Sequence, residues 1–118
     1  KFIFYHGEVP YSKLHEHYKG KDLIVFASSC ENLPIILLEG MATSLPIISS
    51  NLGPMPEILK NNAFYFNPYK SKSIYKTLNK IIFSNSDRIK FSRMLLAESK
   101  KYTWTEAAES TFNFLSIL

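Results

Sequence analysis

Residues 23–48 read LIVFASSCENLPIILLEGMATSLPII, and this stretch decides the fold. It begins with a continuous apolar run at 23–27, which is typical of a strand buried on both faces. After a loop, residues 34–43 have the length and apolar character of a buried helix. A further apolar run, typical of a strand, begins at Pro46. The order strand, helix, strand predicts parallel strands joined by a right-handed crossover.

The flanking sequence continues this alternation in both directions. Upstream, residues 2–5 are apolar or aromatic and predict a strand, and residues 10–19 predict a short amphipathic helix that ends at Gly20. Downstream, residues 54–60 predict a short helix and residues 64–66 a strand. We therefore expect an α/β fold, with a Rossmann-like open parallel sheet of four strands flanked by helices.

The last part of the chain is predicted to be helical throughout. Residues 103–106 read TWTE and form a capping box, in which the Thr103 hydroxyl accepts an amide hydrogen at the third helical position. We expect Trp104 to pack at the start of this final helix. Its inner face is predicted to consist of four residues, Ala108, Thr111, Phe112 and Leu115.

Composition and charge narrow the function classes. The 118 residues are 46% hydrophobic, and the single cysteine, Cys30, excludes an internal disulfide and a cysteine-based zinc site. Residues 60–118 carry ten Lys or Arg against four acids, whereas residues 1–59 carry four against six. Without an arginine cluster or an RNA-binding aromatic motif, this basic half indicates a solvated helix face and no nucleic-acid partner. A peripheral association with an anionic membrane surface stays open.

Ligands of open parallel sheets bind at the carboxyl ends of the strands, so the candidate loops are 6–9, 28–34 and 49–55. The helix that follows the second loop is predicted to have Pro34 at its first position, where its missing N–H costs nothing. Exposed amides and the positive end of the helix dipole make such a helix start a natural phosphate site.

Glu39 is the one charged residue in this apolar helix. An unpaired buried carboxylate is costly, so Glu39 either reaches a cleft at the edge of the sheet or pairs with a cation. It shares a face with Ile35, and it lies about 7.5 Å along the helix axis from Pro34. A diphosphate at the helix start would place its ribose near this carboxylate.

Glu31 lies in the loop on the other side of the helix start, where it would face a group attached to the far phosphate. The two acids together suggest a nucleoside-diphosphate ligand with a hydroxylated group at its end. A plainer interpretation is equally open, in which Glu39 pairs with a lysine and Glu31 caps the helix. Ser28 has two interpretations as well, because its hydroxyl is suited both to a ligand phosphate or Glu31 and to a turn.

At these residues the chain resembles the retaining, GT-B-fold glycosyltransferases of group 1, family four. The resemblance rests on the frame ENLPIILLEGMA at 31–42, in which seven residues separate Glu31 from Glu39. Matching segments follow the order of the family and cover essentially the whole chain: GEVP at 7–10, Tyr18, LIVFAS at 23–28, LPIISSN at 45–51, GPMPE at 53–57, FNP at 66–68 and YTW at 102–104.

The resemblance implies a role for each matched position. Glu31 corresponds to the acid that contacts hydroxyls of the donor sugar at the reacting centre, and Glu39 to the acid that holds the ribose. The backbone amides of Asn32, Leu33 and Ile35 would approach the diphosphate or the sugar. Pro34 has no N–H to donate and would shape the turn between them.

The resemblance also implies an activity. Such enzymes transfer a sugar from a nucleoside-diphosphate donor to a saccharide or lipid-linked acceptor with retention, without a metal or other cofactor, in bacterial polysaccharide or glycoconjugate synthesis. We accordingly expect a cytoplasmic location or the inner face of the membrane. Two rivals remain: a sugar-nucleotide epimerase of GT-B-like fold, and a non-catalytic Rossmann-like interaction domain.

The family's domain organisation implies that residues 1–118 are only part of a nucleotide-sugar-binding domain, the C-terminal part of a GT-B donor domain with extra C-terminal helices. The acceptor domain and the first part of the donor domain would precede it, since the chain starts without Met on an apolar run. We expect no transferase activity from these residues alone. The exposed edge of the sheet would favour a homodimer.

Overall fold

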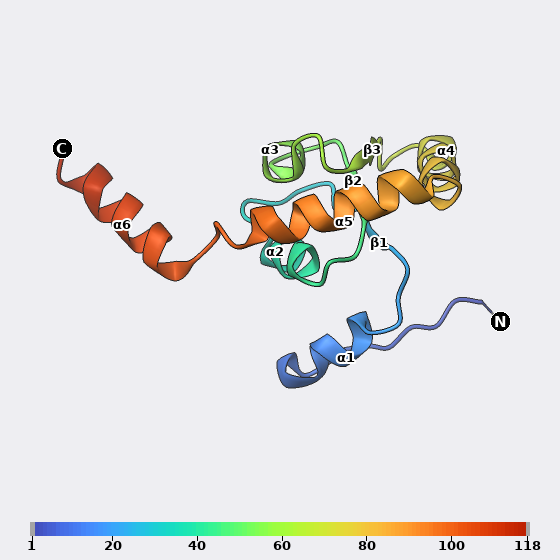
Figure 1. Cartoon of the computed structure of the whole chain (residues 1–118), viewed down its shortest axis with the longest axis horizontal. Helices are drawn as coiled ribbons and strands as arrows, with labels where there is room; N and C mark the ends of the chain where they lie inside the picture. The colour runs from blue at the N-terminus through green and yellow to red at the C-terminus, as the bar shows by residue number, and fades with distance from the viewer. Residues whose placement is uncertain (1, 118) are drawn as a thin grey trace.

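We describe the fold from a computed structural model, which describes residues 2–117. Figure 1 shows a small sheet enclosed by helices, with one helix projecting away from it at the C-terminal end. The elements in chain order are η1 (Tyr11–Lys13), α1 (Leu14–Tyr18), β1 (Ile24–Phe26), α2 (Ile35–Ala42), β2 (Ile47–Ser50), α3 (Met55–Leu59), β3 (Phe64–Phe66), α4 (Ser71–Ile82), α5 (Asn85–Ser99) and α6 (Trp104–Leu115).

The three strands form one parallel sheet in the order β1-β2-β3. Ile24 pairs with Ile47, and Ile48 pairs with Phe64, so β2 is the central strand. All four residues of β2 are buried. This arrangement confirms the predicted α/β fold, with a Rossmann-like parallel sheet that has helices on both faces.

Two apolar clusters fill the two sides of the sheet. On one side, Ile47 packs with Leu37 and Met41 of α2 and with residues of α3. On the other side, Ile48 packs with Phe66 of β3 and Ile81 of α4. Helix α5 crosses both layers, because its Phe91 belongs to the second cluster and its Leu95 to the first. Alternating side chains of one strand therefore anchor both helical layers.

The predicted strand at residues 2–5 is wrong. The segment has no regular secondary structure, and its four side chains are largely exposed. A strand forms only where its backbone pairs with a neighbour, and within residues 2–117 no strand lies beside this segment. The sheet of the described residues accordingly has three strands and not four, and β1 lies at its edge.

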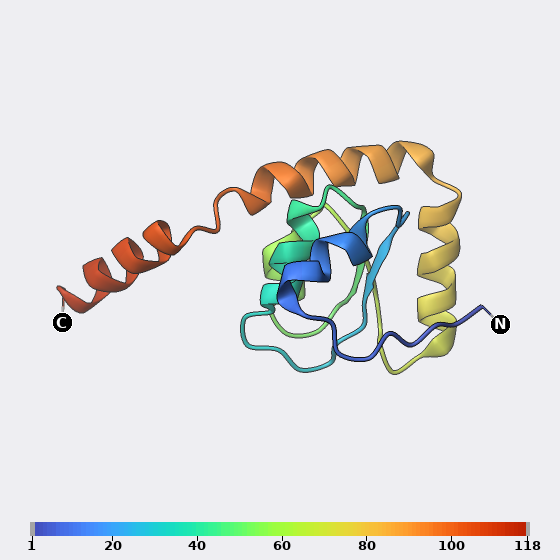
Figure 2. The ribbon, with the colours of Figure 1, turned by 90° about the horizontal axis from the view of Figure 1, so that it is seen from below.

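The predicted packing of the last helix is also wrong. The Thr103 hydroxyl accepts the amide hydrogen of Glu106 at 3.1 Å, as the capping box requires. The helix itself projects from the body in both ribbon views, however, and every described residue after Lys100 is exposed (Figures 1 and 2). Its expected inner face, which includes Phe112 and Leu115, contacts no core of the described residues, and Trp104 is 86% exposed.

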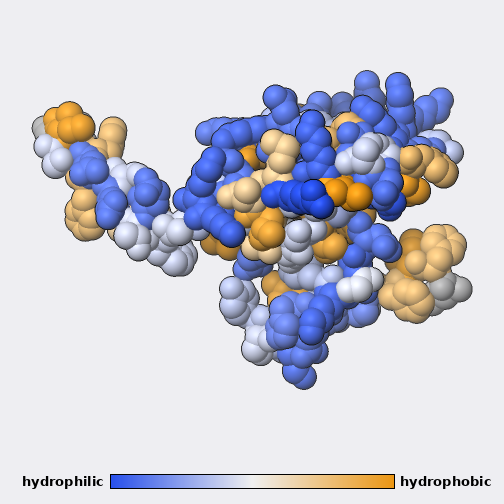
Figure 3. Space-filling model, viewed as in Figure 1, coloured by the Kyte–Doolittle hydropathy of each residue, from blue (hydrophilic) through white to orange (hydrophobic). Residues whose placement is uncertain are grey.

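Apolar surface consequently gathers at both ends of the chain. Figure 3 shows hydrophobic atoms on the projecting α6 and beside the N-terminus, away from the packed body. By contrast, Lys70, Lys72, Lys76 and Lys80 on or next to α4 are all exposed, as predicted for a solvated helix face. None of the helices in residues 2–117 has both the length and the apolar character that crossing a membrane requires.

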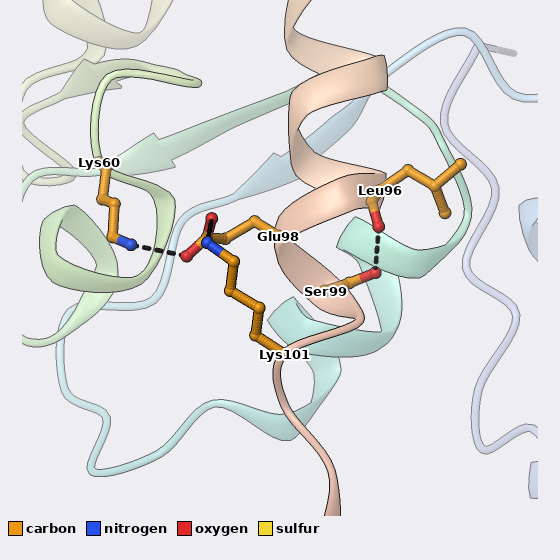
Figure 4. A network of polar contacts seen from close by, with 5 residues as sticks. All are labelled: Lys60, Leu96, Glu98, Ser99 and Lys101. Carbon is orange, nitrogen blue, oxygen red and sulfur yellow. Dashed lines mark hydrogen bonds and ion pairs between the residues drawn. The ribbon is translucent and has the colours of Figure 1, made fainter.

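A charged network fastens the C-terminal end of α5 to the rest of the body (Figure 4). The carboxylate of Glu98 contacts the Nζ of Lys60, the residue that follows α3, at 2.6 Å, and the Nζ of Lys101 at 2.8 Å. Hydrogen bonds from Lys101 and Lys60 lower the pKa of Glu98 below its ordinary value. The hydrogen bond to Glu98 in turn raises the pKa of Lys60.

Leu95→Ala tests the junction of α5 with the first apolar cluster. Leu95 is completely buried, so its truncation is expected to lower the free energy of unfolding by about 2–5 kcal/mol, from lost burial and the cavity left behind. Met94→Ala is the matched control, because Met94 is 44% exposed and its loss should cost less than about 1 kcal/mol. Urea unfolding of both variants measures the difference, and equal losses would contradict the described position of α5.

Glu98→Gln tests the charged network through its pH dependence. The lowered pKa of Glu98 means that its contribution to stability is present above the ordinary glutamate pKa and is lost as the pH falls through the lowered value. The variant should therefore be less stable than the parent at neutral pH and equal to it in strong acid. Thermal unfolding across this range measures the gap. Glu109→Gln, on the exposed α6, should show no such gap, and a pH-independent gap for Glu98→Gln would refute the network.

Candidate functional site

The start of α2 follows the carboxyl end of β1 after the loop at residues 27–34. The sequence pattern predicts Pro34 as the first helical residue, but the structure places it one position earlier, as the N-cap of α2 with φ −77° and ψ 88°. Its carbonyl oxygen accepts hydrogen bonds from the amides of Leu37 at 2.9 Å and Leu38 at 3.3 Å. The side chain of Pro34 is buried, so the loop enters the helix at a fixed angle.

This start leaves backbone amides available to a ligand. Within residues 2–117, the amides of Leu33, Ile35 and Ile36 donate to no backbone or side-chain acceptor of the protein. Contrary to the expectation of a wholly buried helix, the side chains of Ile35 and Ile36 are more than half exposed. Free N–H groups at the positive end of a helix dipole favour a bound anion.

Two neighbouring clefts open along α2, and Glu39 lines both of them. The first, which we call the α1–α2 cleft, has a volume of about 680 Å³. The second, the α2–α6 cleft, has a volume of about 560 Å³. The α1–α2 cleft is lined by residues of η1, α1 and α2 and by the residues that follow the two α-helices; the lining includes Tyr11, His15, Tyr18, Lys19, Glu39 and Thr43. The α2–α6 cleft is lined by Tyr11, Leu33, Ile35, Glu39, Tyr102 and Trp104, among others.

The position of Glu39 decides between its two sequence interpretations. Its side chain is half-buried, and it shares the α2–α6 cleft with Ile35, one helical turn earlier. Both ion pairs found within residues 2–117 belong to Glu98, so Glu39 has no lysine partner there. Glu39 therefore lines a cleft, as the first interpretation expects, although no residue of the three strands lines either cleft.

The structure does not bring every expected residue into these clefts. Leu33, Ile35 and Glu39 lie together in the α2–α6 cleft, whereas Glu31, Asn32 and Ser28 line neither cleft. Glu31 is half-buried in the loop before α2. The hydroxyl of Ser28 donates to the backbone carbonyl of Cys30 at 3.4 Å, which is the turn interaction that the sequence left open.

The loops after β1 and β2 meet beside Glu31. Gly53 has a φ of +55°, and a Cβ built on it would lie 3.7 Å from the carbonyl oxygen of Glu31. A glycine there allows the loop after β2 to turn with a left-handed backbone conformation. The two loops thus form one rim at the carboxyl ends of the strands, which is where open parallel sheets bind their ligands.

Tyr18 is the polar neighbour of Glu39 that the sequence analysis did not single out for a role. It is the last residue of α1, and it lines the α1–α2 cleft together with Glu39. Burial raises the pKa of Tyr18, and the Glu39 carboxylate raises the pKa further. Helical spacing assigned Tyr18 to the apolar face of its helix, and spacing alone carries no information on what lies across a cleft.

Comparison with protein families identifies the family of this chain. The sequence model of the family described as "Glycosyl transferases group 1" matches residues 1–95. The chain belongs to this family. The match includes all three strands, the 31–42 frame with both acids, and Lys60 after α3. It ends within α5.

Curated relatives are similar over most of the chain. It is 25% identical over 112 residues to "Sulfoquinovosyl transferase SQD2" of Arabidopsis thaliana, a match that covers 91% of the chain and 22% of the relative. It is 25% identical over 117 residues to "O-antigen chain mannosyltransferase B" of Escherichia coli, a match that covers 99% of the chain and 31% of that relative. It is 29% identical over 107 residues to "Phosphatidylinositol N-acetylglucosaminyltransferase GPI3 subunit" of Saccharomyces cerevisiae, a match that covers 89% of the chain and 24% of that relative.

A solved structure has the same fold. "Sucrose-phosphate synthase" from Thermosynechococcus elongatus superposes with a TM-score of 0.80 at 15% sequence identity, over 93% of this chain and 28% of that chain. The Rossmann-like parallel sheet with flanking helices is therefore that of a GT-B glycosyltransferase. The chain spans less than a third of the length of each of these relatives.

Proposed function

We propose that this chain supplies the donor-binding half-site of a transferase that moves a sugar from a nucleoside diphosphate to an acceptor, with retention of configuration. One observation carries the proposal: half-buried Glu39 lies in a cleft with Ile35, and within the described residues 2–117 Glu39 has no ion-pair partner and the Ile35 amide has no acceptor. A carboxylate one turn beyond free helix amides matches a ligand that has an anionic diphosphate next to a hydroxylated ribose.

The diphosphate would bind at the amides of Leu33 and Ile35, with Ile36 adding a third free donor. Along the axis of α2, Glu39 lies about 6 Å from Ile35. A phosphate and the ribose attached to it are separated by a similar distance. Its carboxylate oxygens would accept hydrogen bonds from the ribose hydroxyls. The two clefts that meet at Glu39 leave room for the rest of the nucleoside.

The donor sugar would lie on the other side of the diphosphate, against the rim formed by the loops after β1 and β2. Glu31 would accept hydrogen bonds from its hydroxyls, and Asn32 and Ser28 flank the same position. When the glycosidic bond breaks, negative charge develops on the leaving diphosphate. Free amides and the dipole of α2 would stabilise that charge, so we propose no metal cofactor.

We propose a hexose as the transferred sugar, and a saccharide or lipid-linked saccharide as the acceptor. The names of two relatives support this, because one is an O-antigen chain mannosyltransferase and the other a phosphatidylinositol N-acetylglucosaminyltransferase subunit. Since the chain spans less than a third of the length of these relatives, we assign the activity to the whole protein. We propose that the 118 residues alone transfer no sugar.

Glu39→Ala in the whole protein tests the ribose contact. Loss of hydrogen bonds to a charged acceptor, about 1.5–3 kcal/mol each, should weaken binding of UDP or GDP, whichever the parent binds more tightly, by at least about tenfold. Titration calorimetry gives the dissociation constant. Glu16→Ala, on the exposed side of α1, is the control and should leave the dissociation constant unchanged.

Glu31→Ala in the same protein should leave that dissociation constant nearly unchanged while slowing sugar transfer, because Glu31 is assigned to the sugar and not to the nucleotide. Transfer is measured with a panel of nucleotide sugars. If the Glu39 and Glu31 variants both bind nucleotide and transfer sugar like the parent, the site is assigned to the wrong residues.

Ile35→Pro tests the free amide at the helix start. Proline suits the first helical position, so α2 should persist by circular dichroism, and the change removes the N–H together with the isoleucine side chain. Affinity for the nucleoside diphosphate should fall about three- to tenfold, and affinity for the phosphate-free nucleoside should not change. Ile35→Ala is the matched control, because it removes the side chain and keeps the N–H. A loss that is equal in both variants would show that the amide does not bind phosphate.

A further inference from the structure

Helix α4 has an inner face that the core occupies. Ile81 is fully buried in the second apolar cluster, and Ile74 and Leu78 pack against that cluster. The Thr77 hydroxyl donates to the carbonyl oxygen of Tyr65 in β3 at 3.2 Å. Because these residues recur at helical spacing, the rest of α4 lies on its outward side. Both ribbon views place α4 at the opposite end of the body from the projecting α6 (Figures 1 and 2).

The outward side of α4 carries positive charge without a neighbouring acid in the sequence. Four exposed lysines lie on or next to the helix: Lys70, Lys72, Lys76 and Lys80. Residues 58–86 contain no Asp or Glu. Both ion pairs found within residues 2–117 belong to Glu98, and neither involves α4. The Nζ of Lys80 lies over the ring of Phe64, 3.8 Å from its centroid, which leaves the other three lysines as the freest charges of this face.

Exposed apolar side chains lie among these lysines. Phe83 is 84% exposed, and Tyr69 and Tyr75 are more than two-thirds exposed. Phe83 follows Lys72 by about three helical turns, so the two side chains share one side of the helix. Figure 3 shows hydrophilic and hydrophobic atoms side by side at this end of the body. A face that only contacts water needs lysines and does not need these rings.

We propose that the outward side of α4, with Tyr69 before it and Phe83 at its end, docks on an anionic lipid bilayer. The lysines lie at the negatively charged headgroups, and each adds to the attraction. The aromatic rings reach the boundary between headgroups and acyl chains, where amphipathic rings are favoured. Because the inner face stays packed on the sheet, α4 docks without leaving the fold. Neither cleft includes a residue of α4, so this face is separate from the proposed donor site.

The composition of this face favours a bilayer over a nucleic acid. All cations of α4 are lysines, whereas arginine provides the planar fork that nucleic-acid recognition favours. Exposed aromatic rings suit stacked bases as well as lipid. However, Ile82 is 49% exposed and lies two turns beyond Tyr75 on the same side of the helix. An aliphatic side chain offers no plane to a base and is suited to the acyl boundary.

Lys72→Gln combined with Lys76→Gln in the whole protein tests the charges. Co-sedimentation measures binding to vesicles of equal parts phosphatidylcholine and phosphatidylserine, and to vesicles of phosphatidylcholine alone. We expect the parent to bind the anionic vesicles only, and less at high salt, because ions screen exposed charges. The double variant should bind them about ten- to thirtyfold more weakly.

Lys13→Gln combined with Lys21→Gln is the matched control, because it removes the same charge from exposed lysines outside α4 and should bind like the parent. Phe83→Ala removes an exposed ring and should weaken vesicle binding about three- to tenfold, with the parent's salt dependence retained. Affinity for UDP or GDP should not change in any of these variants, which separates this test from that of the donor site.

Two results would overturn the docking face: a parent that does not bind the anionic vesicles, or an α4 double variant that binds them as well as the control does. A parent that binds duplex DNA in place of the vesicles would also overturn it, and would indicate a nucleic-acid partner.

Discussion

Burial of β2 on both faces is the constraint on which the rest of the structure depends. Ile47 and Ile48 are adjacent in sequence and completely buried, but they point into different apolar clusters. A strand with no exposed side needs a helical layer on each face, and parallel neighbours reached through helical crossovers supply those layers. Helix α2 is held on one face in this way and α4 on the other. The carboxyl ends of the strands consequently lie along one rim, next to the start of α2.

The same packing determines what α2 can present to a ligand. Leu37, Gly40 and Met41 face the sheet and are buried, which turns Ile35 and Glu39 toward the open side. A β-carbon on Gly40 would come within 3.0 Å of Ile24 Cδ1, so the helix lies close to the edge strand. The free amides, the helix dipole and the carboxylate are thus oriented by the apolar core on the opposite side of α2.

The sequence predicted the central elements because their apolar residues satisfy each other. Ile24, Ile47 and Leu37 belong to one cluster, and each was recognisable from its own pattern. Two predictions failed for the same reason: the strand at residues 2–5 and the buried inner face of α6, which includes Phe112. An apolar pattern indicates that a segment favours burial, but it does not identify the surface against which the segment packs. The cleft that Tyr18 shares with Glu39 escaped prediction similarly, because it depends on where α1 lies relative to α2.

Partial burial suits Glu39 to the ribose contact that we propose for it. A fully exposed glutamate would hydrogen-bond to water as well as to ribose, so the ribose would gain little. A fully buried and unpaired one would lose its charge, and with it the strong acceptor. Glu39 lies between these limits, half-buried where it lines two clefts. Because no ion pair occupies its carboxylate within residues 2–117, both oxygens would be available to the proposed ribose, whereas an ion pair with a lysine would occupy one of them.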